Sequence, residues 1–259
     1  MTKLLAIGNS FSQDATAYLH DLAAAGGIDC LIVNLCIGGC TLQTHWENAC
    51  ADAVAYAHEV NGVSDGQTSL RQALEERDWD VITLQQASRY SGQSDSYFPY
   101  IENLSEYVRT HAPGAAQWIH QTWAYELDSP QEAFSLYDRD QSVMYRALTQ
   151  AYAEAAARLK LPQIPCGEII QALREMPAFD YAHGGPSLCR DGFHMHLLYG
   201  RYATAAVWYE MLLHGDIRVN PYRPPLAEET PDEPRLAVIR ETVHRICQSG
   251  RRVSKHAAV

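Results

Sequence analysis

The chain alternates short apolar segments with longer segments of helical periodicity, and this alternation constrains its fold more than any other feature. Five segments read as buried strands, because they are short, apolar and bounded by polar or turn residues. They cover residues 4–7, 30–37, 81–84, 117–122 and 161–165. Strands that alternate with helices form a parallel sheet covered on both faces. The order therefore predicts an α/β fold with a five-stranded parallel sheet.

The segments between these strands are expected to be helical. Residues 12–25 carry Leu19 and Leu22 on one face and end at a glycine pair. Further helices are predicted over residues 42–60, 70–76, 100–109, 131–159, 168–175 and 196–214. A surface loop (221–234) and an outer helix (235–248) complete the chain. No repeat or linker separates two cores, so we expect a single domain over residues 1–259.

Charge and composition restrict the class of partner. With 20 Lys+Arg against 31 Asp+Glu, the formal net charge is −11, which disfavours binding to a nucleic-acid backbone. No apolar stretch reaches the roughly 18 residues of a membrane span, and the start of the chain lacks a signal-peptide pattern. The seven cysteines include no C-x-x-C and are typical of a reducing compartment. We expect a cytoplasmic protein without nucleic-acid or membrane partners.

Ser10 follows the first predicted strand, and ligands of open parallel sheets bind beyond the carboxyl ends of the strands. Its hydroxyl would lie over a helix N-terminus, where free amides stabilise negative charge. A structural role is also compatible with the sequence, because Ser10-x-x-Gln13 matches a capping box. Ser10 alone therefore does not decide between a nucleophile and a helix cap.

Asp191-x-x-His194 forms a second cluster, late in the chain. A serine hydroxyl needs a base to accept its proton, and histidine has a suitable pKa. The imidazole in turn needs a carboxylate that fixes its tautomer, and Asp191 can fold back on the His194 ring. Asp191 could instead simply cap the following helix.

Two further strand ends carry groups that could bind an oxyanion. Gly38-Gly39 follows the second strand, where it makes a tight turn or brings a backbone N–H close to a substrate. Gln85 and Gln86 follow the third strand, and a glutamine side chain can donate to an oxyanion. Separate structural roles do not explain why a nucleophile, a base and two donors gather at these positions. Together they predict acyl transfer.

These blocks resemble the SGNH (GDSL-like) hydrolase superfamily. Residues 8–10 (Gly-Asn-Ser) match its first block, Gly39 its second and Asp191-x-x-His194 its last, in order and spacing up to about residue 214. The pattern is most similar to a bacterial branch with G-N-S-F-S, I-G-G-C-T-L, L-Q-Q-A-S and D-G-F-H blocks. The resemblance implies a flavodoxin-like three-layer α/β/α sandwich with a Ser-His-Asp triad.

The resemblance also implies an oxyanion hole made by the amides of Ser10 and Gly39 and by a side chain of the third block. Two positions depart from the superfamily's pattern. Asn9 stands where the usual residue is Asp, and Gln-Gln-Ala-Ser (85–88) replaces the usual Gly-x-Asn-Asp. Gln86 is the expected third donor, with Gln85 and Ser88 as alternatives.

Several aromatic and polar residues near the strand ends are candidates for substrate binding. Such a mixture suits sugar recognition, although Trp and Tyr also pack against sheets. The candidates are His45, Trp46, Gln85, Trp123, Tyr125 and Arg190.

Metal and cofactor sites are less well supported by the sequence. Asp191, His194 and His196 could be read as ligands, but His-x-His at the start of a helix splays its rings apart. The first block lacks both the dinucleotide fingerprint and the Gly-Lys-Ser/Thr of a phosphate loop. Cys40 is expected to be a small buried side chain. We expect no metal and no cofactor.

The sequence thus predicts a serine esterase that removes an acetyl or other short acyl group from a carbohydrate or similar small polar molecule. Ser10 would attack the carbonyl, His194 would accept the proton, and Asp191 would orient His194. The alternative is a non-catalytic carbohydrate-binding module on the same scaffold. The acyl group, the alcohol and a homo-oligomeric state are left open.

Overall fold

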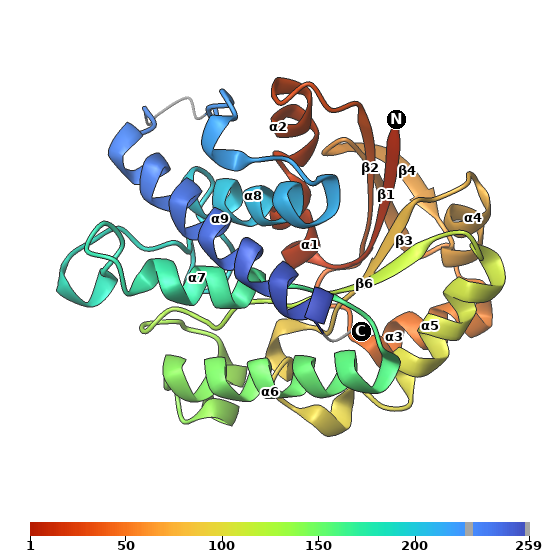
Figure 1. Ribbon diagram of the computed structural model, residues 1–259. Helices are drawn as coiled ribbons and strands as arrows, with labels where there is room; N and C mark the ends of the chain where they lie inside the picture. Colours follow the sequence, from red (N-terminus) through yellow and green to blue (C-terminus); the bar gives the residue numbers. More distant parts are fainter. Residues whose placement is uncertain (226–229, 257–259) are drawn as a thin grey trace.

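A mixed sheet of seven strands lies at the centre of the molecule, in the order β4-β3-β2-β1-β5-β6-β7 (Figure 1). The computed structural model describes residues 1–225 and 230–256. The strands are β1 (Thr2–Gly8), β2 (Cys30–Cys36), β3 (Tyr56–Val60), β4 (Val63–Thr68), β5 (Val81–Leu84), β6 (Ala116–His120) and β7 (Gln163–Ile164). β2, β1, β5, β6 and β7 run parallel, whereas β3 pairs antiparallel with both β2 and β4.

The α/β class is confirmed, but the expected five-stranded, wholly parallel sheet is wrong at one edge. All five predicted strands are present and parallel. The predicted helix 42–60 ends early, and β3 and β4 follow it as a hairpin. Asn61 and Gly62 form the turn with φ values of 50° and 81°. A two-residue hairpin turn with positive φ at both positions favours this dipeptide, which explains the reversal of the chain.

The helices are α1 (Ser10–Thr16), α2 (Leu19–Ala25), α3 (Leu42–Ala51), α4 (Leu70–Glu75), α5 (Tyr100–His111), α6 (Gln141–Leu159), α7 (Cys166–Arg174), α8 (Tyr199–Leu213) and α9 (Glu233–His256). Two predicted helices are interrupted. Residues 12–25 are divided between α1 and α2, and residues 131–159 begin as a 3₁₀ helix before α6. Asp138 and Arg139 separate the latter pair with φ values of 56° and 53°, outside the right-handed helical region.

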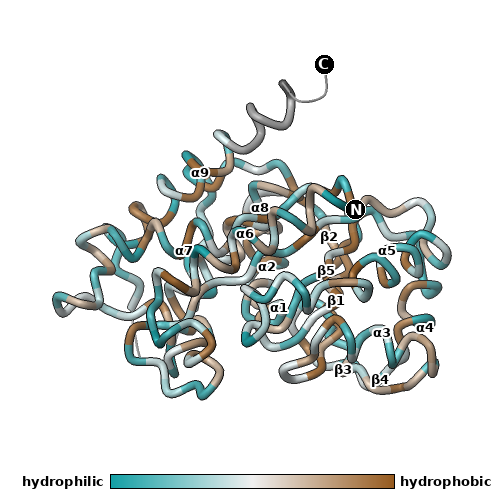
Figure 2. The backbone as a smooth tube through the Cα atoms, turned by 90° about the horizontal axis from the view of Figure 1, so that it is seen from below, coloured by the Kyte–Doolittle hydropathy of each residue, from teal (hydrophilic) through white to brown (hydrophobic). Residues whose placement is uncertain are grey.

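Helices cover both faces of the sheet (Figures 1 and 2). The β1-to-β2 connection crosses the sheet in the opposite direction to the β5-to-β6 connection. Right-handed crossovers therefore put α1 and α2 on one face and α5 on the other. α8 packs on α1 and α2, and α9 lies outside α8. Residues 226–229 of the predicted surface loop lie outside the described residues. No helix in the described part of the chain is long and apolar enough to cross a membrane.

Coverage on both faces explains the apolar character of the central strand. Leu4, Leu5, Ala6 and Ile7 of β1 are each at most 1% exposed. A strand buried on both faces reads as a continuous hydrophobic run rather than an alternating one. β1 therefore gives a rigid support to the residues that follow its carboxyl end.

Two histidines are enclosed close to the sheet. The Nδ1 atom of His45 lies 2.9 Å from the hydroxyl of Tyr56, and the Nδ1 atom of His120 lies 2.7 Å from Oε1 of Gln85. Within the described residues, neither Nε2 atom has a hydrogen-bond partner, and both are buried. Desolvation disfavours the imidazolium form and lowers the pKa of each histidine to about 3.

Because these two histidines are buried in the neutral form, we expect acid to weaken the fold at pH values above those at which carboxylates titrate. The unfolded chain binds protons below about pH 6.5, whereas the folded rings stay neutral until about pH 3. Stability is therefore complete above the unfolded pKa and falls as the pH drops. We expect a slope of about 1.4 kcal/mol per pH unit for each histidine. Urea unfolding between about pH 7 and about pH 5 measures it.

The control is the double variant His45→Asn with His120→Asn. Its total stability can differ from that of the wild type, but its slope over the same pH interval should be much flatter. An unchanged slope would show that other groups take up the protons.

Candidate active site

Ser10 is the first residue of α1, and its neighbour Asn9 caps the helix. The Asn9 side chain accepts a hydrogen bond from the Phe11 amide, and the Asn9 amide donates to Oγ of Ser12. The capping box is thus formed by Asn9 and Ser12, which corrects the alternative based on Ser10 and Gln13. The Ser10 hydroxyl is left available for another partner.

The Asn9 side chain also joins three strand ends. Its Nδ2 donates to the carbonyl of Cys40, beyond β2, at 3.1 Å. Its Oδ1 accepts from Nε2 of Gln85, directly after β5, at 2.9 Å. Gln85 in turn contacts His120 at the end of β6. Since these groups are buried, the network holds the segments after β1, β2 and β5 in a fixed relation.

The loop that carries Asp191 and His194 is a tight reversal of the chain. An isolated antiparallel bridge pairs Cys189 with Met195. Gly192 adopts φ 86°, and a Cβ atom there would lie 2.8 Å from Cα of Ser129. Only glycine therefore fits at position 192.

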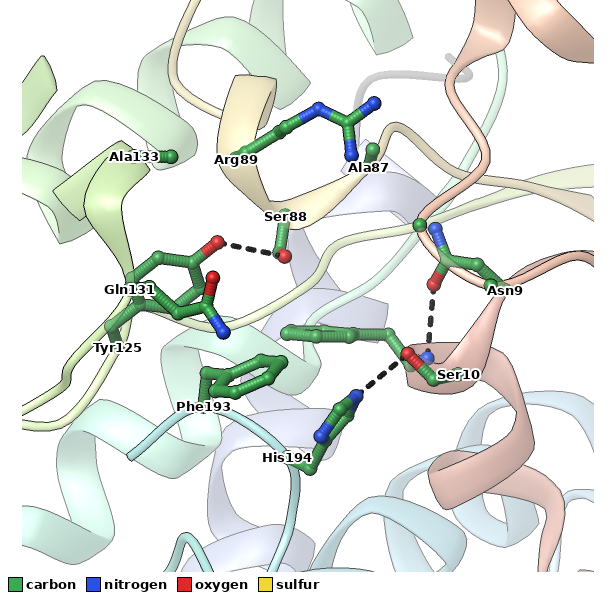
Figure 3. Close-up of a pocket in the computed structure, with 13 residues that line it drawn as sticks. Asn9, Ser10, Ala87, Ser88, Arg89, Tyr125, Gln131, Ala133, Phe193 and His194 are labelled. Atoms are coloured by element: carbon green, nitrogen blue, oxygen red, sulfur yellow. Dashed lines mark hydrogen bonds between the residues drawn. The ribbon is translucent and has the colours of Figure 1, made fainter. Parts of the chain in front are cut away.

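Ser10, His194 and Asp191 form one chain of hydrogen bonds (Figure 3). Oγ of Ser10 lies 2.8 Å from Nε2 of His194, and Nδ1 of His194 lies 2.7 Å from Oδ2 of Asp191. The other Asp191 oxygen accepts from the amides of Phe193 and His194, so Asp191 does not cap α8. Desolvation raises the pKa of the Asp191 carboxyl, but these hydrogen bonds outweigh it and bring the pKa below its usual value.

A buried carboxylate on α1 anchors the loop from behind. Asp14 is fully buried and accepts hydrogen bonds from Arg190, from Nε of Arg201 at 2.8 Å and from the Met195 amide at 2.9 Å. Arg190 also donates to the carbonyl of Met195. Arg190 was expected to bind substrate, but the structure uses its guanidinium to hold the loop next to His194.

Two backbone amides beside Ser10 are available to a ligand. Neither the Ser10 N–H nor the Gly39 N–H donates to another group in the described part of the chain. Gly39 adopts φ 61°, a conformation that L side chains rarely take. A turn of this kind can direct a backbone N–H toward an oxygen that bulkier residues would block.

Gln86, the expected third oxyanion donor, lies elsewhere. Its Nε2 donates to both the carbonyl and the hydroxyl of Ser96, and its Oε1 accepts from the amides of Leu42 and Ala87. Both side-chain N–H groups are therefore occupied, and only 1% of the residue is exposed. The structure corrects this expectation: Gln86 fixes the start of α3 instead of facing a substrate.

The two alternatives differ in position. Gln85 is buried in the network with Asn9 and His120. Ser88 faces the cavity described next, and its Oγ lies 3.0 Å from the hydroxyl of Tyr125. Of the three side chains considered as donors, Ser88 is the one that a ligand beside Ser10 could reach.

A cavity of about 320 Å³ opens above Ser10 and His194. This volume suits a small ligand or part of a larger one. Its lining combines aromatic rings with a few polar groups. The lining residues are Asn9, Ser10, Phe11, Gly38, Gly39, Ala87, Ser88, Arg89, Tyr125, Gln131, Ala133, Phe193 and His194.

Of the six residues expected to bind substrate, Tyr125 lines this cavity. His45 and Trp123 are buried, and Trp46 packs against Tyr107. Trp123 stacks on Phe11 with ring centroids 4.3 Å apart and donates from Nε1 to the Phe193 carbonyl. It therefore supports the floor of the site and the His194 loop without facing a ligand.

Phe193, Arg89 and Gln131 line the cavity but were not among the sequence-based candidates. Phe193 lies between the predicted Asp191 and His194, so that motif was the signal for it. Arg89 directly follows the third block. Gln131 precedes the 3₁₀ helix Glu132–Tyr137 and carries no motif that could have revealed it.

The metal reading of Asp191, His194 and His196 is not supported by the arrangement. Both ring nitrogens of His194 already have partners. In residues 1–225 and 230–256, the group that meets the spacing of metal ligands is elsewhere, at Glu210, Asp216 and His244. Burial raises the pKa of the Cys40 thiol to about 12, which disfavours a thiolate.

The comparisons with known proteins identify the family and the fold. Residues 3–237 match the family described as a domain of unknown function, DUF4886. The chain belongs to the DUF4886 family. A crystal structure of a DUF4886 protein from Bacteroides uniformis shares 36% identity and a TM-score of 0.87, covering 94% of this chain and 93% of that one. No curated protein matches the chain in sequence.

More distant structures show the fold of the SGNH hydrolases. A candidate SGNH hydrolase from Slackia heliotrinireducens has 21% identity and a TM-score of 0.55, with 81% of this chain and 97% of that chain covered. A lipase/acylhydrolase from Enterococcus faecalis has 13% identity and a TM-score of 0.53, with 88% and 100% covered. The chain is therefore structurally similar to SGNH/GDSL-like hydrolases, as the sequence blocks indicated.

The Asp14 anchor gives a testable consequence. Asp14→Asn removes the buried charge that the partly exposed Arg190 and Arg201 share, and breaking a buried ion pair costs up to about 3–5 kcal/mol. We expect a loss of this size in the free energy of unfolding, measured by urea denaturation. Asp21→Asn, on the exposed side of α2, is the matched control and should stay within about 0.5 kcal/mol of the wild type. Equal effects of the two substitutions would contradict the assigned role.

Proposed function

We propose that this protein is a serine esterase of the SGNH type. The observation that carries the proposal is the hydrogen-bonded chain Ser10–His194–Asp191 at the floor of a cavity. Nδ1 of His194 donates to Asp191, which leaves Nε2 as the acceptor for the Ser10 proton. This tautomer is the one a general base needs.

In the proposed reaction, Ser10 Oγ attacks the ester carbonyl while His194 Nε2 takes the hydroxyl proton. The protonated His194 then gives this proton to the leaving alcohol, and the acyl group remains on Ser10. Water attacks the acyl-enzyme in the second half, with His194 again as the base. Asp191 holds the ring and stabilises its positive charge throughout.

The tetrahedral intermediate carries a negative oxygen, which the free amides of Ser10 and Gly39 are suited to bind. We assign the third donor to Ser88, since its hydroxyl faces the cavity and Gln86 has no N–H to spare. The Ser88 hydroxyl can rotate from Tyr125 toward the oxyanion.

We further propose a short acyl group, such as acetyl, on a carbohydrate or similar polar alcohol. The cavity of about 320 Å³ limits the size of the group at Ser10. Phe193 offers an aromatic surface, while Gln131 offers an amide for hydroxyl groups.

The first test is hydrolysis of 4-nitrophenyl acetate, followed by acetate release from a panel of acetylated sugars. A serine esterase turns over the nitrophenyl ester, and the Ser10→Ala protein does not. Sugar binding by a wild-type protein that hydrolyses no ester would instead favour the non-catalytic binding module.

Ser10→Ala and His194→Ala should each lower kcat by several orders of magnitude, because each removes the same proton transfer. The double variant should be little slower than either single variant, since residues that act as a unit are not additive. Far-ultraviolet circular dichroism should show an unchanged fold. Losses that add in full on a logarithmic scale would argue against a shared role.

If Ser88 is the third oxyanion donor, substitutions at Ser88 and at Gln86 should have different effects. Ser88→Ala should lower kcat by about 10²-fold with KM nearly unchanged, because the donor acts on charge that develops in the transition state. Gln86→Ala should mainly lower stability, by about 1–3 kcal/mol for each buried amide left without an acceptor. Ser94→Ala, outside the cavity, is the control for Ser88. If Gln86→Ala instead lowers kcat at unchanged stability, the assignment to Ser88 fails.

A further inference from the structure

Arg89 is the one permanently charged side chain among the residues that line the cavity in the described structure. It is partly exposed and lies in the 3₁₀ turn Ser88–Tyr90 that follows β5. The lining contains no carboxylate. The cavity wall therefore carries a positive charge that no acidic neighbour in the lining neutralises.

The guanidinium of Arg89 has no ion pair or hydrogen bond within the described residues. The two arginines behind the site behave differently, because Arg190 and Arg201 share the buried Asp14. An arginine presents five N–H donors in a planar fork that matches carboxylate, phosphate and sulfate oxygens. Arg89 keeps this capacity free where a ligand would lie.

One contact orients Arg89 without using its donors, and a neighbouring glycine leaves space for it. Its guanidinium carbon lies 5.1 Å from the centre of the Tyr90 ring, a cation–π contact. Its Nη1 atom lies 3.1 Å from the point where a Cβ of residue 39 would stand. Glycine at position 39 thus leaves room for the guanidinium beside the turn that follows β2.

We propose that Arg89 binds an anionic group of the substrate, so that the preferred substrate is an ester that carries a carboxylate, sulfate or phosphate. This inference rests on the proposed esterase function and names its substrate class. The anion would form charge-assisted hydrogen bonds to Arg89 while the ester carbonyl lies at Ser10.

Charge preference, and not position alone, separates this role from that of an oxyanion donor, because the guanidinium of Arg89 lies near Gly39. Figure 3 shows Arg89 on one side of the cavity and His194 on the opposite side, with Ser10 near His194. A substrate that extends from Ser10 toward Arg89 would place its anionic group at the guanidinium. The protein carries a net charge of −11, so its overall field repels anions. Recognition of an anion therefore needs a local contact of this kind.

The experiment compares esters matched in shape but not in charge. One pair is 4-acetoxybenzoate and 4-acetoxybenzamide, with the anion in the alcohol part. The other is phenyl hydrogen adipate and phenyl adipamate, with the anion in the acyl part. We expect wild-type kcat/KM to favour the anionic member of at least one pair. The pair that shows this preference identifies the side of the ester that faces Arg89.

Arg89→Gln should lower kcat/KM for that anionic ester by about 10- to 100-fold, the loss of one charge-assisted contact. The neutral partner should change by less than about 3-fold. Arg89→Lys should restore part of the preference, and added salt should weaken it in the wild type. Arg77→Gln, near Glu76 at the surface, is the control and should leave both esters unchanged.

An equal loss on charged and neutral esters would overturn the inference and make Arg89 a transition-state donor. No charge preference in the wild type would also overturn it. If the wild type cleaves none of the four esters, hydrolysis of 4-nitrophenyl acetate decides about the proposed function, and calorimetry with Ser10→Ala protein decides about Arg89. Binding of 4-acetoxybenzoate that Arg89→Gln abolishes supports anion recognition, whereas no binding, or binding independent of Arg89, refutes it.

Discussion

The side chain of Asn9 is the interaction on which the geometry of the site depends. One buried amide caps α1, donates to the Cys40 carbonyl and accepts from Gln85, so it ties together the chain beyond β1, β2 and β5. Water cannot replace these bonds in an enclosed network, and each group left unpaired would cost about 1–3 kcal/mol. The departure from Asp at this position has a local reason, because an ionised Asp has no N–H for Cys40.

α1 connects this network to the opposite wall of the site. Ser10 and Asp14 are four residues apart and therefore share one face of the helix. Ser10 contacts the His194 ring, and Asp14 holds the loop on either side of that ring through Arg190 and the Met195 amide. A single rigid helix thus fixes both ends of the Ser10–His194 hydrogen bond. Such preorganisation is what proton transfer at a fixed distance requires.

The sequence predicts those strands whose burial requires a run of apolar residues. The five parallel strands are short apolar runs because helices cover both of their faces. β4 lacks this signal, since residues 63–67 are exposed and carry no alternation. The signal for the hairpin was the Asn61-Gly62 dipeptide, which directly follows the predicted helix 42–60 and favours a two-residue turn between strands. Turn chemistry was therefore better evidence at this edge than helical periodicity.

In the candidate site, the sequence predicts the position of the backbone better than the direction of the side chains. Ser10 and Gly39, which follow strand ends, meet His194 of the late loop as the sequence predicted, while the catalytic roles of these residues stay proposals. The direction of a side chain is set by packing that the sequence does not display. Gln86 turns to satisfy the backbone of α3 and Ser96, whereas the 3₁₀ turn that follows directs Arg89 into the cavity. In this fold the amides of the third block therefore have structural partners, and the Ser88 hydroxyl and the adjacent Arg89 guanidinium are the groups that line the cavity.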